Sequence, residues 1–245
     1  MRKSNKLIIL YLFFILCFYG YMFVFEIHNF HKIFRHLYLP YINKNNYFDF
    51  FVLSLTYPSS YCLNHLNCSG EQINYINKDF NIHGLWANNY DGSYPSFCSS
   101  IPFDNKYIEE NESLFKKYWG TFNNVLEYDF YKHEWDKHGT CSNSSKIYDN
   151  KSYFSNTLQL MKEYNILECL KRKNIYPSNT KTYTNNEIKN SLYECYPYSF
   201  NINCETKRKK NYITEIHFYY SKDLEHIKFD YGDKCNNEIL IPIIN

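Results

Sequence analysis

The sequence contains no C-x-x-C pair, although nine of its 245 residues are cysteine. Structural zinc sites are usually built on such closely spaced pairs, so their absence argues against a zinc-stabilised fold. Net charge is also small, at +2. Residues 1–25 hold three of the 27 basic residues and none of the 25 acidic ones, which leaves the remainder near −1. Bulk charge therefore does not favour a general nucleic-acid binder, and any such affinity must come from a local site.

The chain shows neither an internal repeat nor a regular alternation of strands and helices. Apolar and β-branched residues predict strands over 48–56 and within 73–86, the second ending at His83, and alternation predicts another over 211–221. Helices are predicted over 109–119, 130–138 and 153–161, and after the capping box of Thr184 and Glu187. A loop is expected over 88–100. We therefore expect an α+β fold in one domain, with a central, mainly antiparallel sheet flanked by helices.

The amino terminus is typical of a targeting segment. Arg2, Lys3 and Lys6 precede nineteen uncharged residues, Leu7 to Phe25. No clear small-x-small cleavage site follows, so a cleaved signal peptide and a retained signal anchor both remain open. A buried core helix is the third interpretation, disfavoured because the segment is apolar on every face. Residues 26–46 have no period and are interpreted as a linker or stalk, and 47–245 as the folded domain.

Eight cysteines remain once Cys17 in the leader is set aside. An even number behind a targeting segment predicts disulfides in an oxidising compartment. N-x-[ST] sequons begin at Asn67, Asn111, Asn143 and Asn150. They agree with a glycoprotein exposed to the lumen of the secretory pathway.

Ionisable residues gather in the segment His133-Glu134-Trp135-Asp136-Lys137-His138-Gly139-Thr140-Cys141. On a helix, four of them, at 133, 134, 137 and 138, share an arc of about 140°. A zinc protease motif needs two histidines at i and i+4, whereas these two are five residues apart. The spacing instead suits several groups that surround a substrate phosphate.

RNA transphosphorylation needs a base for the 2′-hydroxyl proton, an acid for the leaving 5′-oxygen, and cations for the extra charge on phosphorus. Histidine suits both proton transfers near neutral or mildly acidic pH. The helix supplies one histidine, so a second must come from elsewhere. His83, next to a glycine that permits close backbone approach, is the candidate.

Two segments, Ile82-His83-Gly84-Leu85-Trp86 and 133–141, resemble the two active-site signatures of the ribonuclease T(2) family. The resemblance extends from about Phe50 to Pro242, so 47–245 would be the catalytic domain. It implies an endoribonuclease that cleaves single-stranded RNA through a 2′,3′-cyclic phosphate to a 3′-phosphate, without a metal or other cofactor. The need for a 2′-hydroxyl would spare DNA.

The resemblance also implies residue roles. His138 would be the base of the cyclisation step and His83 the acid. Glu134 and Lys137 would stabilise the transition state, and His133 would contact phosphate. The substrate base would meet three further residues: Trp86, Tyr94 and Asn88. Ala87 replaces the family's usual proline, and Asn88 stands where some members carry an acidic base-selecting residue.

The family pattern implies the disulfides Cys62–Cys68, Cys98–Cys141 and Cys204–Cys235. Cys169 and Cys195 both lie on predicted helices, and we expect them to pair. The cysteine pair of the family's penultimate hairpin is absent, with Tyr219 at the position of the first.

We expect a monomer, secreted or in the endolysosomal lumen, with residues 7–25 as a membrane tether if the leader is retained. The alternatives are a non-catalytic lumenal binding or signalling protein on the same fold, and a zinc hydrolase. A degenerate relative would usually lose a histidine, and both are present here.

Overall fold

The computed structural model describes residues 47–64, 68, 78–122, 126–236 and 238–243. The predicted leader and stalk lie outside this part of the chain. Among the helices that the structure describes, none combines the length and the apolar character needed to cross a membrane.

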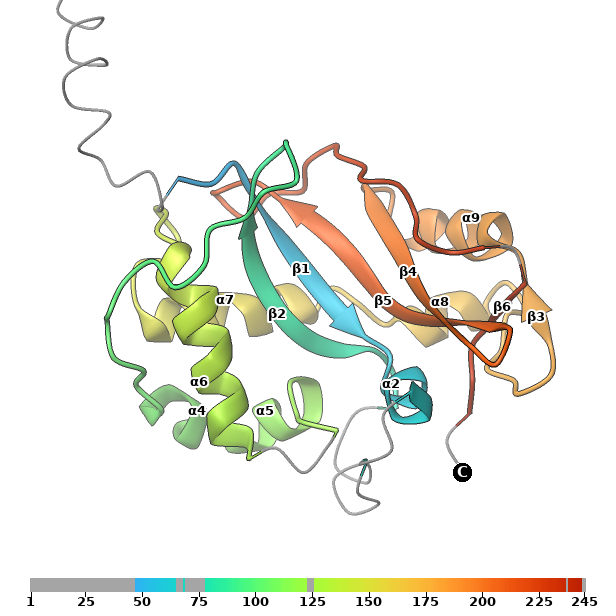
Figure 1. The fold of residues 1–245 in the computed structure, drawn as a ribbon, viewed down its shortest axis with the longest axis horizontal. Coiled ribbons are helices and arrows are strands. Elements are labelled where there is room, and N and C mark those ends of the chain that lie inside the picture. The colour runs from blue at the N-terminus through green and yellow to red at the C-terminus, as the bar shows by residue number, and fades with distance from the viewer. Residues whose placement is uncertain (1–46, 65–67, 69–77, 123–125, 237, 244–245) are drawn as a thin grey trace, which may run out of the picture. The chain divides into compact units, whose positions relative to one another are not determined.

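Within the described residues, six strands form one sheet (Figure 1). The first strand, β1, lies between β2 and β5 and is antiparallel to both, and β4 pairs antiparallel with β5. The short strand β6 is parallel to β5 and antiparallel to β3. The strands are β1 Phe50–Thr56, β2 Asn81–Asn88, β3 Thr182–Tyr183, β4 Phe200–Lys207, β5 Lys210–Tyr220 and β6 Ile239–Leu240. The expected α+β fold with a mainly antiparallel sheet is confirmed.

The helices lie beside and behind this sheet: α6 stands next to β2, and α7 and α8 cross behind the strands (Figure 1). They are α2 Pro58–Asn64, α4 Lys106–Glu110, α5 Glu112–Tyr118, α6 Glu127–Lys137, the 3₁₀ turn η2 Gly139–Cys141, α7 Asn150–Met161, α8 Ile166–Lys171 and α9 Asn185–Cys195.

The two faces of the sheet differ because alternate residues of a strand point to opposite sides. On β1, Phe51, Leu53 and Leu55 belong to the main hydrophobic core. Val52, on the other face, belongs to a small cluster with Phe50 and Tyr219. The helix-covered face therefore stabilises the fold, and the opposite face is left for a site.

Several predicted elements differ from the structure in their bounds. The helices predicted over 130–138 and 153–161 each begin three residues earlier, at Glu127 and Asn150. The helix predicted over 109–119 is two helices, divided at Asn111, whose side-chain amide donates a hydrogen bond to the Tyr107 carbonyl. Such local bonds compete with continuous helix. The strand predicted to end at His83 instead runs to Asn88, because β1 pairs with it along its whole length.

Four disulfides join the cysteines in the expected pairs. They are Cys62–Cys68, Cys98–Cys141, Cys169–Cys195 and Cys204–Cys235. The third links α8 to α9, in agreement with the helical positions expected for both cysteines.

Candidate active site

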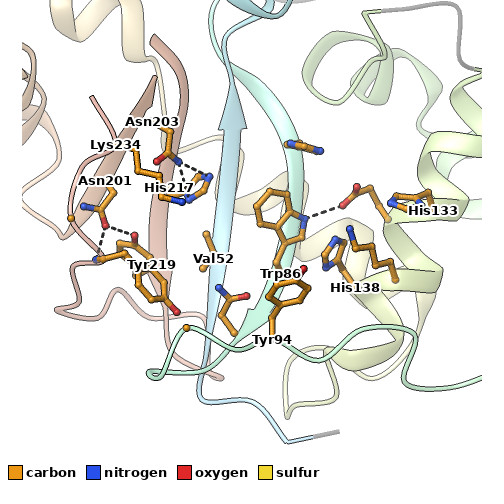
Figure 2. A pocket seen from close by; sticks show the side chains of 17 residues that line it. Val52, Trp86, Tyr94, His133, His138, Asn201, Asn203, His217, Tyr219 and Lys234 are labelled. Atoms are coloured by element: carbon orange, nitrogen blue, oxygen red, sulfur yellow. Dashed lines mark hydrogen bonds between the residues drawn. The ribbon is translucent and has the colours of Figure 1, made fainter. Parts of the chain in front are cut away.

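A cavity of about 500 Å³ lies on the face of the sheet opposite the main core (Figure 2). Residues from β1, β2, β4, β5, α6 and the loops after β2 and β5 surround it. They are Val52, His83, Trp86, Asn88, Gly92, Tyr94, His133, Glu134, Lys137, His138, Asn201, Asn203, His217, Tyr219, Tyr231, Gly232 and Lys234. All eight candidate catalytic and substrate-binding residues therefore line one cavity.

A β-bulge directs His83 into this cavity. Leu55 of β1 pairs with Ile82 and Ser54 with Gly84, so His83 is an extra residue with no partner on β1. In a regular strand, residues 83 and 86 would point to opposite faces. The bulge shifts the alternation by one residue, so that His83 and Trp86 both reach the cavity.

Glu215 on β5 holds the His83 ring. Its Oε1 atom lies 2.7 Å from His83 Nδ1 and also accepts a hydrogen bond of 3.0 Å from the Thr56 hydroxyl. Its Oε2 atom lies 3.0 Å from His217 Nε2. The carboxylate thus joins two imidazoles, and Thr56, its cross-strand partner, fixes its orientation.

Helix α6 brings Glu134 against β2. The Trp86 indole donates a hydrogen bond of 3.1 Å to Glu134 Oε2. A Cβ atom on Gly84 would lie only 2.1 Å from the same oxygen. Glycine is therefore required at position 84 for the carboxyl group to approach the strand.

His138 caps the carboxyl end of α6, and its amide donates to the Glu134 carbonyl over 3.1 Å. The turn η2 begins at Gly139, where a Cβ atom would lie 2.3 Å from the Trp135 ring. His138 is only 6% exposed, and its Nδ1 atom is buried without a hydrogen-bond partner in the described structure. Its ring centroid lies 5.3 Å from that of Trp86.

The two candidate acid–base histidines differ in proton affinity. Burial lowers the pKa of His83, but the hydrogen bond and charge of Glu215 outweigh it, and the net pKa is raised above the ordinary value. Burial lowers the pKa of His138 to about 3, with the positive charges of Lys137, His133 and His83 acting in the same direction. His83 therefore favours the protonated form and His138 the neutral form.

The carboxyl groups also differ. Burial raises the pKa of Glu134 to about 7, against the opposing effects of His83, the Trp86 indole and Lys137. Burial acts in the same sense on Glu215, but hydrogen bonds from His217 and His83 outweigh it and lower its pKa. Near neutral pH, Glu215 is thus an anion, whereas Glu134 can carry a proton.

The remaining candidates lie around this centre. Trp86 is packed among three imidazoles, with ring centroids 5.0 Å from His83, 5.3 Å from His138 and 5.7 Å from His217. Tyr94 is 58% exposed. Asn88 ends β2, and His133, on an exposed part of α6, has a pKa lowered by partial burial and by Lys137.

Two residues of the site, Glu215 and His217, were not predicted from the sequence. A signal was present: the strand predicted over 211–221 alternates, so residues 215 and 217 must share a face. That pattern did not indicate which strand would lie next to His83. In the described part of the chain, no three His, Cys, Asp or Glu side chains are grouped so that they could hold a metal ion.

Two histidines of opposite proton affinity, a lysine and a buried carboxyl group around one cavity are the groups of an acid–base enzyme for an anionic substrate. A model of the ribonuclease T2 family matches residues 48–235, and the chain belongs to that family. It is 37% identical to Ribonuclease DdI of Dictyostelium discoideum over 61% of this chain, but spans only 65% of that protein. It is 32% identical to Extracellular ribonuclease LE of Solanum lycopersicum over 83% of this chain and 91% of the relative.

Solved structures share the fold. The crystal structure of RNase NT in complex with 5′-AMP is similar with a TM-score of 0.72 and 31% identity. The match covers 80% of this chain and 98% of that one.

Proposed function

We propose that this protein is a metal-independent endoribonuclease that cleaves single-stranded RNA by transphosphorylation. It forms a 2′,3′-cyclic phosphate, which it then hydrolyses to a 3′-phosphate. The observation that carries the proposal is the opposite proton affinity of His83 and His138, which line one cavity and both pack against Trp86.

In the first step, neutral His138 takes the proton of the 2′-hydroxyl as this oxygen forms a bond to phosphorus. The bond from phosphorus to the 5′-oxygen breaks, and protonated His83 gives its proton to the leaving oxygen. Glu215 supports this role because its carboxylate favours the imidazolium form of His83. In the second step water takes the place of the leaving alcohol, and the two histidines exchange roles.

The charge that develops on the phosphoryl oxygens is stabilised by Lys137 and by Glu134 in its protonated form, which donates a hydrogen bond. The raised pKa of Glu134, about 7, makes this form accessible in neutral or mildly acidic solution. His133 contacts phosphate at the edge of the cavity, and Trp86, Tyr94 and Asn88 contact the base.

The four disulfides support maturation in an oxidising compartment, because such bonds persist there and not in the cytosol. We therefore propose a protein of the secretory pathway, either secreted or held in the endolysosomal lumen. We also propose that it acts as a monomer.

The test uses purified protein and a defined oligoribonucleotide, with products identified by mass. We expect cyclic phosphates that convert to 3′-phosphates, an unchanged rate in EDTA, and no cleavage at a linkage whose nucleotide lacks the 2′-hydroxyl. His83→Phe or His138→Phe should lower kcat by at least about 100-fold. His226→Phe is the matched control, since His226 pairs with Glu163 away from the cavity. Products with 5′-phosphates, or loss of activity in EDTA, would overturn the proposal.

A further inference from the structure

Phe97 is an exposed aromatic residue in a backbone conformation that phenylalanine rarely adopts. Its φ angle is 53°, and 62% of the residue is exposed. In this left-handed region the Cβ atom lies too close to the following carbonyl oxygen, which disfavours bulky L-residues. Exposure of the ring also forgoes most of the gain from apolar burial. Phenylalanine at this position is therefore explained neither by its backbone preference nor by burial of its ring.

The loop that carries Phe97 is fixed to the candidate active site. The Phe97 amide donates a hydrogen bond of 3.0 Å to the Lys137 carbonyl. The next residue, Cys98, forms the disulfide with Cys141, and its amide donates to the Thr140 hydroxyl over 3.1 Å. The loop is thus held at the carboxyl end of α6, where Lys137 and His138 lie.

The ring itself lies beside a candidate phosphate contact. Its centroid is 6.5 Å from that of His133, and the two rings are nearly perpendicular. His133 and Lys137 line the cavity, whereas Phe97 lies outside it. An RNA chain held at Lys137 and His133 would bring its next base over the exposed ring.

We infer that Phe97 is a stacking platform for a nucleobase next to the two that flank the cleaved linkage. The inference rests on the proposed function and extends it from a dinucleotide to a longer single strand. Aromatic rings serve this purpose without base preference, because every nucleobase has a π-face. The strained backbone is then explained, since it keeps the ring presented to the RNA.

Three substitutions separate the ring from the backbone. Phe97→Gly removes the ring and relieves the backbone, Phe97→Ala removes only the ring, and Phe97→Trp keeps a stacking surface. Glycine is preferred to asparagine for relieving the backbone, because asparagine before Cys98 and Ser99 would create a glycosylation sequon. Tyr193→Ala is the control, because Tyr193 is 57% exposed but lies on α9 and does not line the cavity.

The substrates are a dinucleoside monophosphate and two oligonucleotides that extend it by three nucleotides, on the 5′ or the 3′ side. We expect Phe97→Gly and Phe97→Ala to lower kcat/KM about fivefold to 160-fold for one extended substrate, the range of base–aromatic stacking. Cleavage of the dinucleotide should stay within about twofold of wild type. Phe97→Trp and Tyr193→Ala should cleave all three substrates like wild type.

The thermal midpoint should move in the opposite direction from activity. The Phe97 ring is largely exposed and glycine has no Cβ atom to strain at this φ, so Phe97→Gly should melt at or up to about 2–4 °C above wild type. If the ring serves RNA contact, Phe97→Gly should be less active than wild type on the extended substrate but no less stable. A merely structural role predicts that activity and stability fall together.

Unchanged kcat/KM ratios for both extended substrates would overturn the platform while leaving the proposed function intact. Absence of all cleavage by wild type would instead overturn the proposed function. In that case, binding of a 2′-O-methyl hexanucleotide still tests the platform. Its affinity must fall in Phe97→Gly and Phe97→Ala and hold in Phe97→Trp, and equal affinities would contradict the inference.

Discussion

The Nδ1 atom of His83 lies 2.7 Å from Oε1 of Glu215, although the two residues are 132 positions apart in the chain. This contact leaves the other ring nitrogen of His83 for the substrate and favours the imidazolium form. We therefore assign to Glu215 the role of positioning His83, the candidate acid. Carboxylates commonly orient histidines in this way.

Glu215→Gln should shift the pH profile rather than abolish activity at every pH. Without the carboxylate, the pKa of His83 falls, so the limb on which kcat/KM declines with rising pH should move down by about one unit or more. Activity should recover partly in acid. The control is Glu163→Gln, which changes a comparable histidine pair outside the cavity. An equal loss at all pH values would indicate a structural role only.

The wild-type enzyme should show a bell-shaped dependence of kcat/KM on pH. The rate rises as the base loses its proton and falls as the acid loses its own. The low limb should lie well in the acid range, because the pKa of His138 is lowered to about 3, and the upper limb should lie above the ordinary histidine value. Both limbs belong to a coupled set of groups rather than to single residues.

Lys137→Met tests whether the charge of Lys137 lowers the pKa of His138. Removal of the positive charge raises the pKa of His138, so the low limb should move to higher pH in addition to any loss of rate. A profile that is flat from pH 4 to 9 in wild type would contradict the two-histidine mechanism. A low limb unchanged in Lys137→Met would remove Lys137 from the control of His138.

The disulfide Cys98–Cys141 should matter for catalysis as well as for stability. It closes 43 residues and Cys169–Cys195 closes 26, so loss of either should lower stability by about 3–4 kcal/mol on the chain-entropy model. Only the first joins the loop after β2 to the end of α6. Paired Cys-to-Ala variants, assayed while fully folded, should show at least a tenfold loss of kcat/KM for Cys98–Cys141 alone, roughly the sensitivity expected of misplaced groups. Equal activities in the two variants would contradict this role.

Asp79 should make the protein more stable in acid than at neutral pH. Burial raises its pKa to about 6, against hydrogen bonds from the amides of Phe80 and Leu167. A raised pKa means that the protonated form stabilises the fold. This contribution is complete below about pH 4 and is lost as the pH rises through 6.

Urea unfolding of Asp79→Asn checks this, because asparagine can still accept from both amides but does not titrate. The variant should match wild type near pH 4 and exceed it at pH 8 by at most about 3 kcal/mol. Asp129→Asn, at an exposed position on α6, is the control. A difference that stays constant between pH 4 and 8 would show that Asp79 acts by contacts alone.

Several features could be predicted from the sequence because they depend on residues close together in the chain. The capping box of Thr184 and Glu187 starts α9 as expected, and the pattern around β1 predicted a buried strand. Residues 133–138 could be placed near the end of one helix. A turn of helix or a strand repeat is a local interaction, so its signal lies in local spacing.

Other features were decided only by tertiary structure. Glu215 reaches His83 because β5 pairs with the opposite edge of β1 from β2, and the bulge at His83 depends on the register of β1 against β2. Periodicity indicates which residues share a face, but not which strands become neighbours or where their register shifts. The reactive groups could therefore be predicted from local sequence, whereas the packing of distant strands set their orientation and proton affinity.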